Sequence, residues 1–266
     1  MDKKKIILTT ITIILLIIDF FLAYLLFDKY VLKTNFEKDM LSFANKNENT
    51  IFKIEKITFF SSCNAQNKTL SNTNFTLENL YQYTDMAFFI TSSSSEKNSE
   101  NTLKNVFIDN IKFNHIPEVG EQSLYYKNIN NFAKSDIIIK ENLITDKLEF
   151  NITSEDEANF DQPTLYNNLA NPIVLSYINS NIKTDYTITD TSNPITYDGS
   201  LLQKCNVLLD SIACNLSFDI YITNNLNQEF KCTIYVDIPL KNDNKSIYDG
   251  NIILKKDTNF IFYRYK

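Results

Sequence analysis

The hydrophobic pattern divides the chain into two parts of different character. Ile6–Phe27 is a nearly continuous apolar run in which Asp19 is the single ionisable residue. A helix rises about 1.5 Å per residue, so about 20 apolar residues cross the roughly 30 Å hydrocarbon layer of a membrane. From residue 50 onward, apolar and polar positions alternate over short runs instead. The pattern predicts one N-terminal helix followed by a β-rich domain.

The apolar run has the features of an uncleaved membrane anchor. Lys3, Lys4 and Lys5 precede it, and no small-x-small cleavage site follows it. It is also longer than the apolar part of a cleaved secretory signal, which is about 7–15 residues and is the competing interpretation. We therefore predict a cytoplasmic basic tail at 1–5, a single-pass signal-anchor helix at 6–27, and an extracytoplasmic C-terminal domain.

Asp19 lies inside the predicted span. A carboxylate near the bilayer centre costs about 2.5–3.5 kcal/mol on insertion scales, while each Leu, Ile or Phe contributes roughly 0.3–0.6 kcal/mol in favour. The favourable insertion energies of the neighbouring apolar residues can therefore offset the cost of the Asp19 carboxylate. Two hypotheses stay open: Asp19 makes a helix–helix contact with a partner or a second copy, or it is tolerated without a role.

Helical spacing continues after the apolar run. Leu32, Phe36, Met40 and Phe43 recur at intervals that place them on one face of a helix. We predict a helical stalk over 28–47. With fewer than three heptads, its apolar stripe is expected to pack on its own domain and not in a coiled coil.

The remaining residues, 48–266, show the pattern of many short strands. Polar clusters rich in Asn, Asp, Ser and Pro separate the runs, as is typical of a sandwich or barrel. The fold class predicted is mainly β, an antiparallel β-sandwich-like domain. An acidic stretch near 156–163 either divides it into two lobes or is a loop within one. The strand runs are 51–60, 85–91, 103–113, 123–127, 135–139, 147–153, 172–178, 182–189, 213–223, 229–240, 251–256 and 259–265.

The clearest local prediction is a hairpin made by 213–223 and 229–240. Cys214, Leu216 and Phe218 share a face with each other, and Cys232 and Ile234 share a face on the return strand. A loop centred near residue 226 places Cys214 opposite residue 237 or 238. One buried and one solvated face indicate an antiparallel sheet.

The charge balance excludes one class of partner. The net charge is −6, and residues 1–27 carry +1, so the remainder carries −7. An acidic domain is a poor binder of nucleic acid, whose phosphates require a basic face. The same argument disfavours anionic head groups or wall polymers as the main ligand.

The four cysteines lack the CxxC spacing of zinc or redox sites. In the hairpin, Cys214 lies roughly 17–20 Å from Cys232 at about 3.4 Å per residue, beyond the limit of about 7 Å for a disulfide. Buried free thiols are the main expectation. If a disulfide forms, Cys63–Cys205 is the best candidate pair.

The sequence offers few candidates for chemistry. His115 is the only histidine, and no GxSxG or comparable nucleophile motif accompanies it. We therefore name no catalytic residue and no cofactor. An acidic cluster offers oxygen ligands for a cation but lacks EF-hand spacing, so it is a weak metal candidate. Its members are Glu155, Asp156, Glu157 and Asp161.

These observations lead to three hypotheses for function. The first is a non-enzymatic interaction or structural protein of the cell envelope, with a protein partner or a second copy as its ligand. The second is a carbohydrate- or wall-binding module, which predicts an exposed row of tyrosines on one sheet face. The third is a wall-active hydrolase, which needs two carboxyl groups roughly 5–10 Å apart across a cleft.

Overall fold

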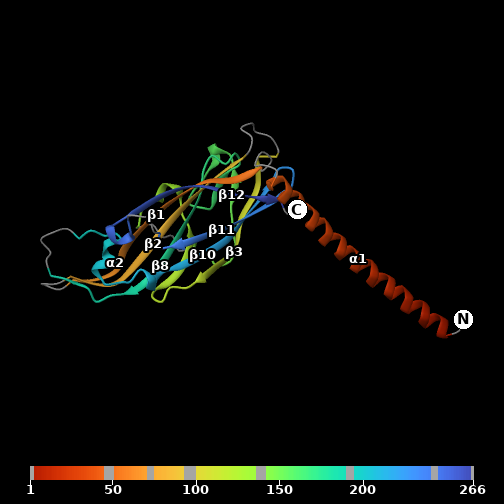
Figure 1. Ribbon diagram of the computed structural model, residues 1–266, viewed down its shortest axis with the longest axis horizontal. Helices are drawn as coiled ribbons and strands as arrows, with labels where there is room; N and C mark the ends of the chain where they lie inside the picture. Colours follow the sequence, from red (N-terminus) through yellow and green to blue (C-terminus); the bar gives the residue numbers. More distant parts are fainter. Residues whose placement is uncertain are drawn as a thin grey trace.

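The protein is mainly β, with antiparallel pairing in both of its main sheets. The computed structural model describes residues 3–44, 51–70, 75–92, 100–135, 142–189, 195–240 and 245–264, and it describes side chains of the N-terminal helix mainly from Thr12 onward. The sheets form an elongated body from whose end a single long helix projects (Figure 1). The chain ends beside the base of that helix.

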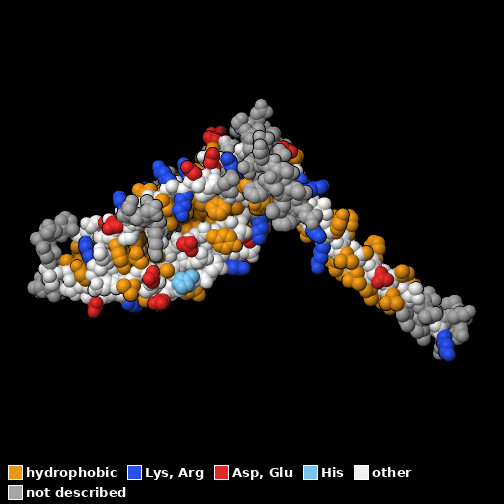
Figure 2. All heavy atoms as spheres, in the orientation of Figure 1, with side chains coloured by type: hydrophobic (Ala, Val, Ile, Leu, Met, Phe, Trp, Pro, Cys, Tyr) orange, Lys and Arg blue, Asp and Glu red, His pale blue; other side chains and the backbone are white. Residues whose placement is uncertain are grey.

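Helix α1 (Lys3–Ala44) is continuous through the apolar run and through the expected stalk as far as Ala44, and residues 45–47 lie outside the described residues. Large apolar side chains between Ile13 and Leu32 are exposed along it (Figure 2). Within the described residues, no helix combines the length and the apolar character needed to cross a membrane. Its contact with the rest of the protein includes β13, a short strand near the end of the chain.

The larger sheet has β12 at one edge and β4 at the other. Its strands are, in spatial order, β12 (Ile252–Ile261), β1 (Phe52–Leu70), β2 (Phe75–Ser92), β8 (Ile173–Lys183) and β4 (Glu121–Tyr126), with β9 (Thr187–Ile188) paired to β2.

The smaller sheet has five strands and includes the predicted hairpin. Its strands are, in spatial order, β13 (Tyr263–Arg264), β11 (Glu229–Ile238), β10 (Cys214–Asn224), β3 (Leu103–His115) and β5 (Leu148–Glu149). A separate parallel pair and short helices complete the fold: β6 (Asn151–Thr153), β7 (Thr164–Tyr166), α2 (Ser200–Lys204), and the 3-10 turns η1 (Ile129–Asn131), η3 (Glu155–Glu157), η4 (Asp210–Ile212) and η5 (Ile247–Asp249).

The two main sheets pack face to face through apolar side chains. Phe88 of the larger sheet meets Phe218 of the smaller one edge to face, with ring centroids 5.6 Å apart. Phe52 and Phe230 make a similar contact at 5.3 Å. These four rings are buried, and such pairs contribute beyond the burial of their area. One continuous core therefore joins the sheets.

The predicted hairpin is confirmed in register. Cys214 of β10 pairs with Ile238 of β11, and Ile220 pairs with Cys232. The alternation of apolar and polar positions was sufficient here because one face of the hairpin is apolar and the other is polar.

The first two strands are longer than predicted, since their apolar alternation stops while the strands continue. Ser61, Gln82 and Thr84 stand at inward positions in the register and are buried. Their side chains bond to one another: Ser61 and Thr84 hydroxyls lie 2.8 Å apart, and the Gln82 amide donates to Thr84 at 2.9 Å. Mutual hydrogen bonding lets polar side chains occupy a buried face, so the sequence pattern hides this part of the sheet.

The chain's final runs differ from the prediction of a strand pair. Ile252–Ile261 is one strand of the larger sheet, and after Phe262 the chain enters the smaller sheet as β13. Ile261 pairs with Lys53, whereas Tyr263 pairs with Lys231. The run predicted at 135–139 lies, apart from Ser135, outside the described residues.

Candidate functional site

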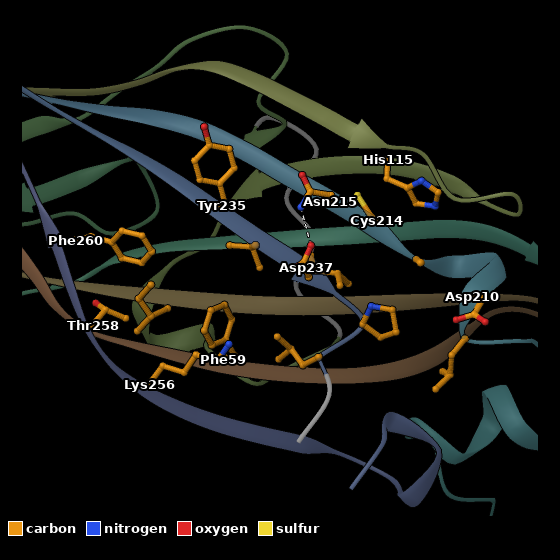
Figure 3. Close-up of a pocket in the computed structure, with 17 residues that line it drawn as sticks. Phe59, His115, Asp210, Cys214, Asn215, Tyr235, Asp237, Lys256, Thr258 and Phe260 are labelled. Carbon is orange, nitrogen blue, oxygen red and sulfur yellow. Dashed lines mark hydrogen bonds between the residues drawn. The ribbon is translucent and has the colours of Figure 1, made fainter. Parts of the chain in front are cut away.

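A hollow of the described surface lies between an edge of each sheet. The larger sheet ends at β12, and beyond the two residues that pair with β13 the smaller sheet ends at β11. A cavity of about 590 Å³ lies between these strands (Figure 3). We call it the edge groove.

The floor of the edge groove is apolar. It is made by side chains from the inner faces of both sheets and from the turns beside them, namely Ile57, Phe59, Leu209, Val236, Ile238, Leu240 and Phe260. Most are buried, but Phe260 and Leu209 are only half-buried. The groove thus gives access from solvent to the apolar interior between the sheets.

The rim is polar and carries both signs of charge. His115 and Asp210 lie at one end, and Phe260 and Tyr235 lie toward the other (Figure 3). Asp237 accepts a hydrogen bond of 2.7 Å from the Asn215 amide. The four groups His115, Asp210, Tyr235 and Asp237 are all exposed, so each can meet a ligand.

Lys256 is the lysine of the rim, and it occupies an unusual position in its strand. It pairs in register with Ile57, an inward-facing residue, so it occupies an inward position of an edge strand. Its side chain is nevertheless exposed, and its Nζ lies 5.9 Å from the centre of the Phe59 ring. An inward-pointing charge on an edge strand is a known protection against edge-to-edge aggregation.

The backbone along the groove is free over much of its length. Among the described residues, β12 pairs only with β1, and β11 beyond Lys231 pairs only with β10. At one end the groove is closed by the passage of the chain into β13, where the Phe262 amide donates to the Phe52 carbonyl at 3.1 Å. The groove is therefore a wedge between two sheet edges, closed near β13, with Asp210 toward its other end (Figure 3).

A thiol and an imidazole lie in the edge groove. Cys214 and His115 both line it, but burial raises the pKa of the Cys214 thiol, which keeps it protonated and weakly nucleophilic. Over the described part of the chain, no hydrogen bond connects His115 with a serine or cysteine. A hydrogen bond of this kind is one way in which a base activates a serine or cysteine nucleophile.

A second surface lies on the outer face of the smaller sheet. Phe107 and Tyr221 stack with centroids 4.6 Å apart, and Lys147 and Lys231 cover the two ends of this pair at 4.1 and 5.5 Å. The ring faces are thereby occupied within the protein. Of the β-domain tyrosines whose exposure is described, Tyr235 alone is exposed, at 63%, so the described tyrosines form no exposed row.

Asp219 lies beside this stack and is a centre of hydrogen bonding. It accepts from Lys231 at 2.8 Å, from Thr233 at 2.6 Å and from Asn110 at 2.8 Å. Burial by itself raises the pKa of Asp219, but these three donors outweigh it and leave the pKa below its ordinary value.

We expect Asp219 to contribute to acid sensitivity. Its lowered pKa gives a stabilising contribution that is complete above the unfolded value of 3.8 and is lost as pH falls through the folded pKa. Urea unfolding at about pH 6 and about pH 3 should therefore show a smaller acid-induced loss in Asp219→Asn than in the unchanged protein. Asp237→Asn, at an exposed carboxylate of the same sheet face, is the control. Equal losses in all three proteins would contradict the assignment.

The outer face of the larger sheet holds a buried ion pair. Lys127 Nζ lies 2.6 Å from Asp85 Oδ2, and their side chains are 6% and 0% exposed. Asp85 also accepts from the Ser176 hydroxyl at 2.7 Å and the Ala133 amide at 2.8 Å, and Lys127 donates to the Lys134 carbonyl at 2.6 Å. The segment after β4 thus covers this sheet face and supplies one charge of the pair.

The acidic cluster proposed as a weak metal site is dispersed in the structure. Glu155, Asp156 and Glu157 form the exposed turn η3, with Asp161 exposed nearby. Their partners are separate amides and hydroxyls: Asn168 for Glu155, Thr153 for Glu157 and Asn128 for Asp161. Over the residues whose placement is described, no three metal-ligating side chains gather.

The four cysteines are free thiols. Cys63 and Cys205, the candidate disulfide pair, lie near enough that their charges interact, and burial is the main reason that the pKa of Cys63 is raised. Burial likewise raises the pKa of Cys232 to about 12. Such thiols are poor nucleophiles and weak redox sensors.

The remaining predicted residue, Asp19, lies on α1 with its side chain exposed. The groove itself was not anticipated, since its walls come from segments that are distant in sequence. One signal was present: in the run 252–258, Ile252 and Leu254 face inward and Lys256 breaks the alternation. A charge at an inward position indicates a sheet edge.

Comparisons with protein-family models, with characterised proteins and with solved structures give no match to this chain. The edge groove and the N-terminal helix are therefore the features from which a function can be inferred.

Proposed function

We propose that the protein is a membrane-tethered, non-enzymatic interaction module that binds a partner protein through the edge groove. The observation that carries this proposal is the groove itself: an open apolar floor between two strands with free edges and a rim of both charges. Apolar surface ringed by polar groups is typical of interaction sites. Its volume lies within the range of about 300–1,000 Å³ usual for binding pockets.

The tether is proposed from the sequence of α1. The apolar run extends from Ile6 to Phe27. The structure describes the helix side chains mainly from Thr12 onward, so the first part of the run precedes them. With Lys3–Lys5 before it, this run supports a single-pass anchor whose N-terminus is cytoplasmic and whose β-sandwich-like domain is extracytoplasmic. The projection of α1 from one end of the β-domain (Figure 1) suits such a tether.

Site-specific photo-crosslinking on the full chain in its own membranes tests the proposal. Membranes are first washed with carbonate, so that recovery of the protein there also tests the anchor. A benzophenone side chain replaces Tyr235 on the groove rim in one variant and Ile253 in the other. Both native side chains are 63% exposed and both face the outside of their sheet, but Tyr235 lines the edge groove, whereas Ile253, which pairs with Phe60, does not.

We expect a crosslinked partner from position 235 and none from position 253. Equal crosslinking at both positions, or none at either, contradicts the proposal. An Asp19→Leu variant measured in parallel assigns the role of the helix. Loss of the crosslink in that variant would mean that α1 takes part in recognition, whereas retention places recognition on the β-domain alone.

A further inference from the structure

We propose that the edge groove binds its partner as an added β-strand: an extended segment that pairs with the free edge of β11, places alternate apolar side chains on the groove floor and sets a carboxylate beside Lys256. This inference rests on the proposed function and names the class of partner.

The backbone edge of β11 already has a strand at one end. Phe230 pairs with Arg264 and Lys231 pairs with Tyr263, so β13 occupies the first positions of this edge. From Cys232 to Ile238 the same edge has no described strand beside it. At about 3.3 Å per residue this stretch is roughly 20 Å long, the length of an ordinary strand. A segment added there continues the row that β13 begins.

The floor suits a chain in extended conformation. Successive side chains of a strand point to opposite sides, so a segment paired with β11 directs every second side chain between the sheets. There it meets the apolar residues Phe59, Val236 and Phe260. Main-chain hydrogen bonds then give affinity, and the pockets for alternate side chains give specificity.

The charges indicate what the segment carries. Lys256 belongs to no ion pair among the described residues, and a strand laid over it would remove it from water. Covering an uncompensated ammonium group is costly, so the partner is expected to present an Asp or Glu at this point. At the end away from β13, Asp210 and Asp237 favour a cationic side chain instead.

The same lysine argues against a second copy as the occupant. Two copies joined groove to groove would bring two Lys256 side chains into one interface, and like charges there are unfavourable. The domain as a whole is also acidic. We therefore commit to a different protein, which offers an extended, alternating segment with one acidic residue.

A phage-displayed library of random twelve-residue peptides, selected on the detergent-solubilised full chain, tests the inference. We expect enriched peptides to alternate apolar and polar residues around one Asp or Glu, and to crosslink to the benzophenone at position 235. Methylation of alternate backbone nitrogens on the groove-pairing side of the best peptide should abolish its binding, because it removes the donors that pair with β11.

A matched pair of charge reversals completes the test. Lys256→Glu should weaken the best peptide about tenfold, and exchange of the peptide's acid for lysine should restore binding to this variant. Lys255→Glu makes the same change in net charge on the same strand, but Lys255 pairs with Thr58 on the outer face, so it should leave affinity unchanged. Thermal unfolding of both variants verifies that they are folded.

The outcomes separate this inference from the proposed function. Peptides that crosslink at position 235 but lack alternation, or tolerate backbone methylation, overturn strand addition and leave an interaction site in the groove. Equal sensitivity to Lys256→Glu and Lys255→Glu overturns the charge assignment. Absence of enriched peptides overturns the inference. The proposed function is tested separately, by the crosslink at position 235 in native membranes.

Discussion

Replacing Lys127 with methionine is expected to lower the free energy of unfolding by about 3–5 kcal/mol at neutral pH. The substitution leaves the Asp85 carboxylate buried at 0% exposure with two neutral donors and no counter-charge. The loss should far exceed that at exposed pairs such as Lys53–Glu55, which are worth about 0–1 kcal/mol. Urea unfolding followed by circular dichroism measures it.

The pH dependence of this variant has a defined sign. Burial raises the pKa of Asp85, and Lys127 opposes that rise, so removing Lys127 raises the pKa further. A carboxyl group whose pKa is higher in the folded than in the unfolded protein takes up its proton preferentially when folded. The destabilisation of Lys127→Met should therefore shrink as pH falls from about 8 toward about 5.

A double variant is the control for this interpretation. Asp85→Leu together with Lys127→Met removes both charges and should recover much of the stability lost in the single variant, since buried ion pairs are often replaceable by apolar residues. Two results would show that the ion pair does not stabilise this sheet face. One is a loss of less than about 1 kcal/mol in the free energy of unfolding of Lys127→Met, and the other is a double variant no more stable than the single one.

Truncation of the central aromatic contact is the second large effect expected. Phe88→Ala should cost about 3–5 kcal/mol, because it removes a buried ring from the interface between the sheets and leaves a cavity. Phe218 loses its edge-to-face partner at 5.6 Å. A double-mutant cycle with Phe218→Ala should give a coupling of about 0.5–1.5 kcal/mol.

Phe89 provides a matched control on the neighbouring position. It is only half-buried, it points to the other face of β2, and Lys56 Nζ lies 4.2 Å from its ring centre. Phe89→Ala should therefore destabilise the protein clearly less than Phe88→Ala in the same urea experiment. Equal losses would contradict the assignment of Phe88 to the core between the sheets.

The sequence predicted those parts of the fold in which one face is apolar and the other polar. The β10–β11 hairpin was obtained with its register because Cys214, Leu216 and Phe218 alternate cleanly. The full length of β1 and β2 was not predicted, because the polar side chains of Ser61 and Thr84 lie on the buried face, where they hydrogen-bond to each other. Periodicity detects burial only where burial is apolar.

The edge groove could not be predicted from the sequence for a related reason. The edge groove depends on which strands lie at sheet edges, and strand order is a non-local property that no short pattern encodes. Asp85 and Lys127 likewise are 42 positions apart and meet only because the sheet places β8 between β2 and β4. Lys256, by contrast, broke a visible alternation and could have been identified as an edge residue.

The direction in which α1 leaves the β-domain determines how the protein bears load. β1 begins at Phe52, at the end of the domain from which the helix projects, and runs along its long axis between β12 and β2 (Figure 1). Tension between the helix and a partner held farther along that axis would pull β1 lengthwise. Its two ladders would then be strained in shear, with many hydrogen bonds stretched together instead of opened one after another. With the proposed tether, a domain attached in this way would resist being pulled apart along its long axis.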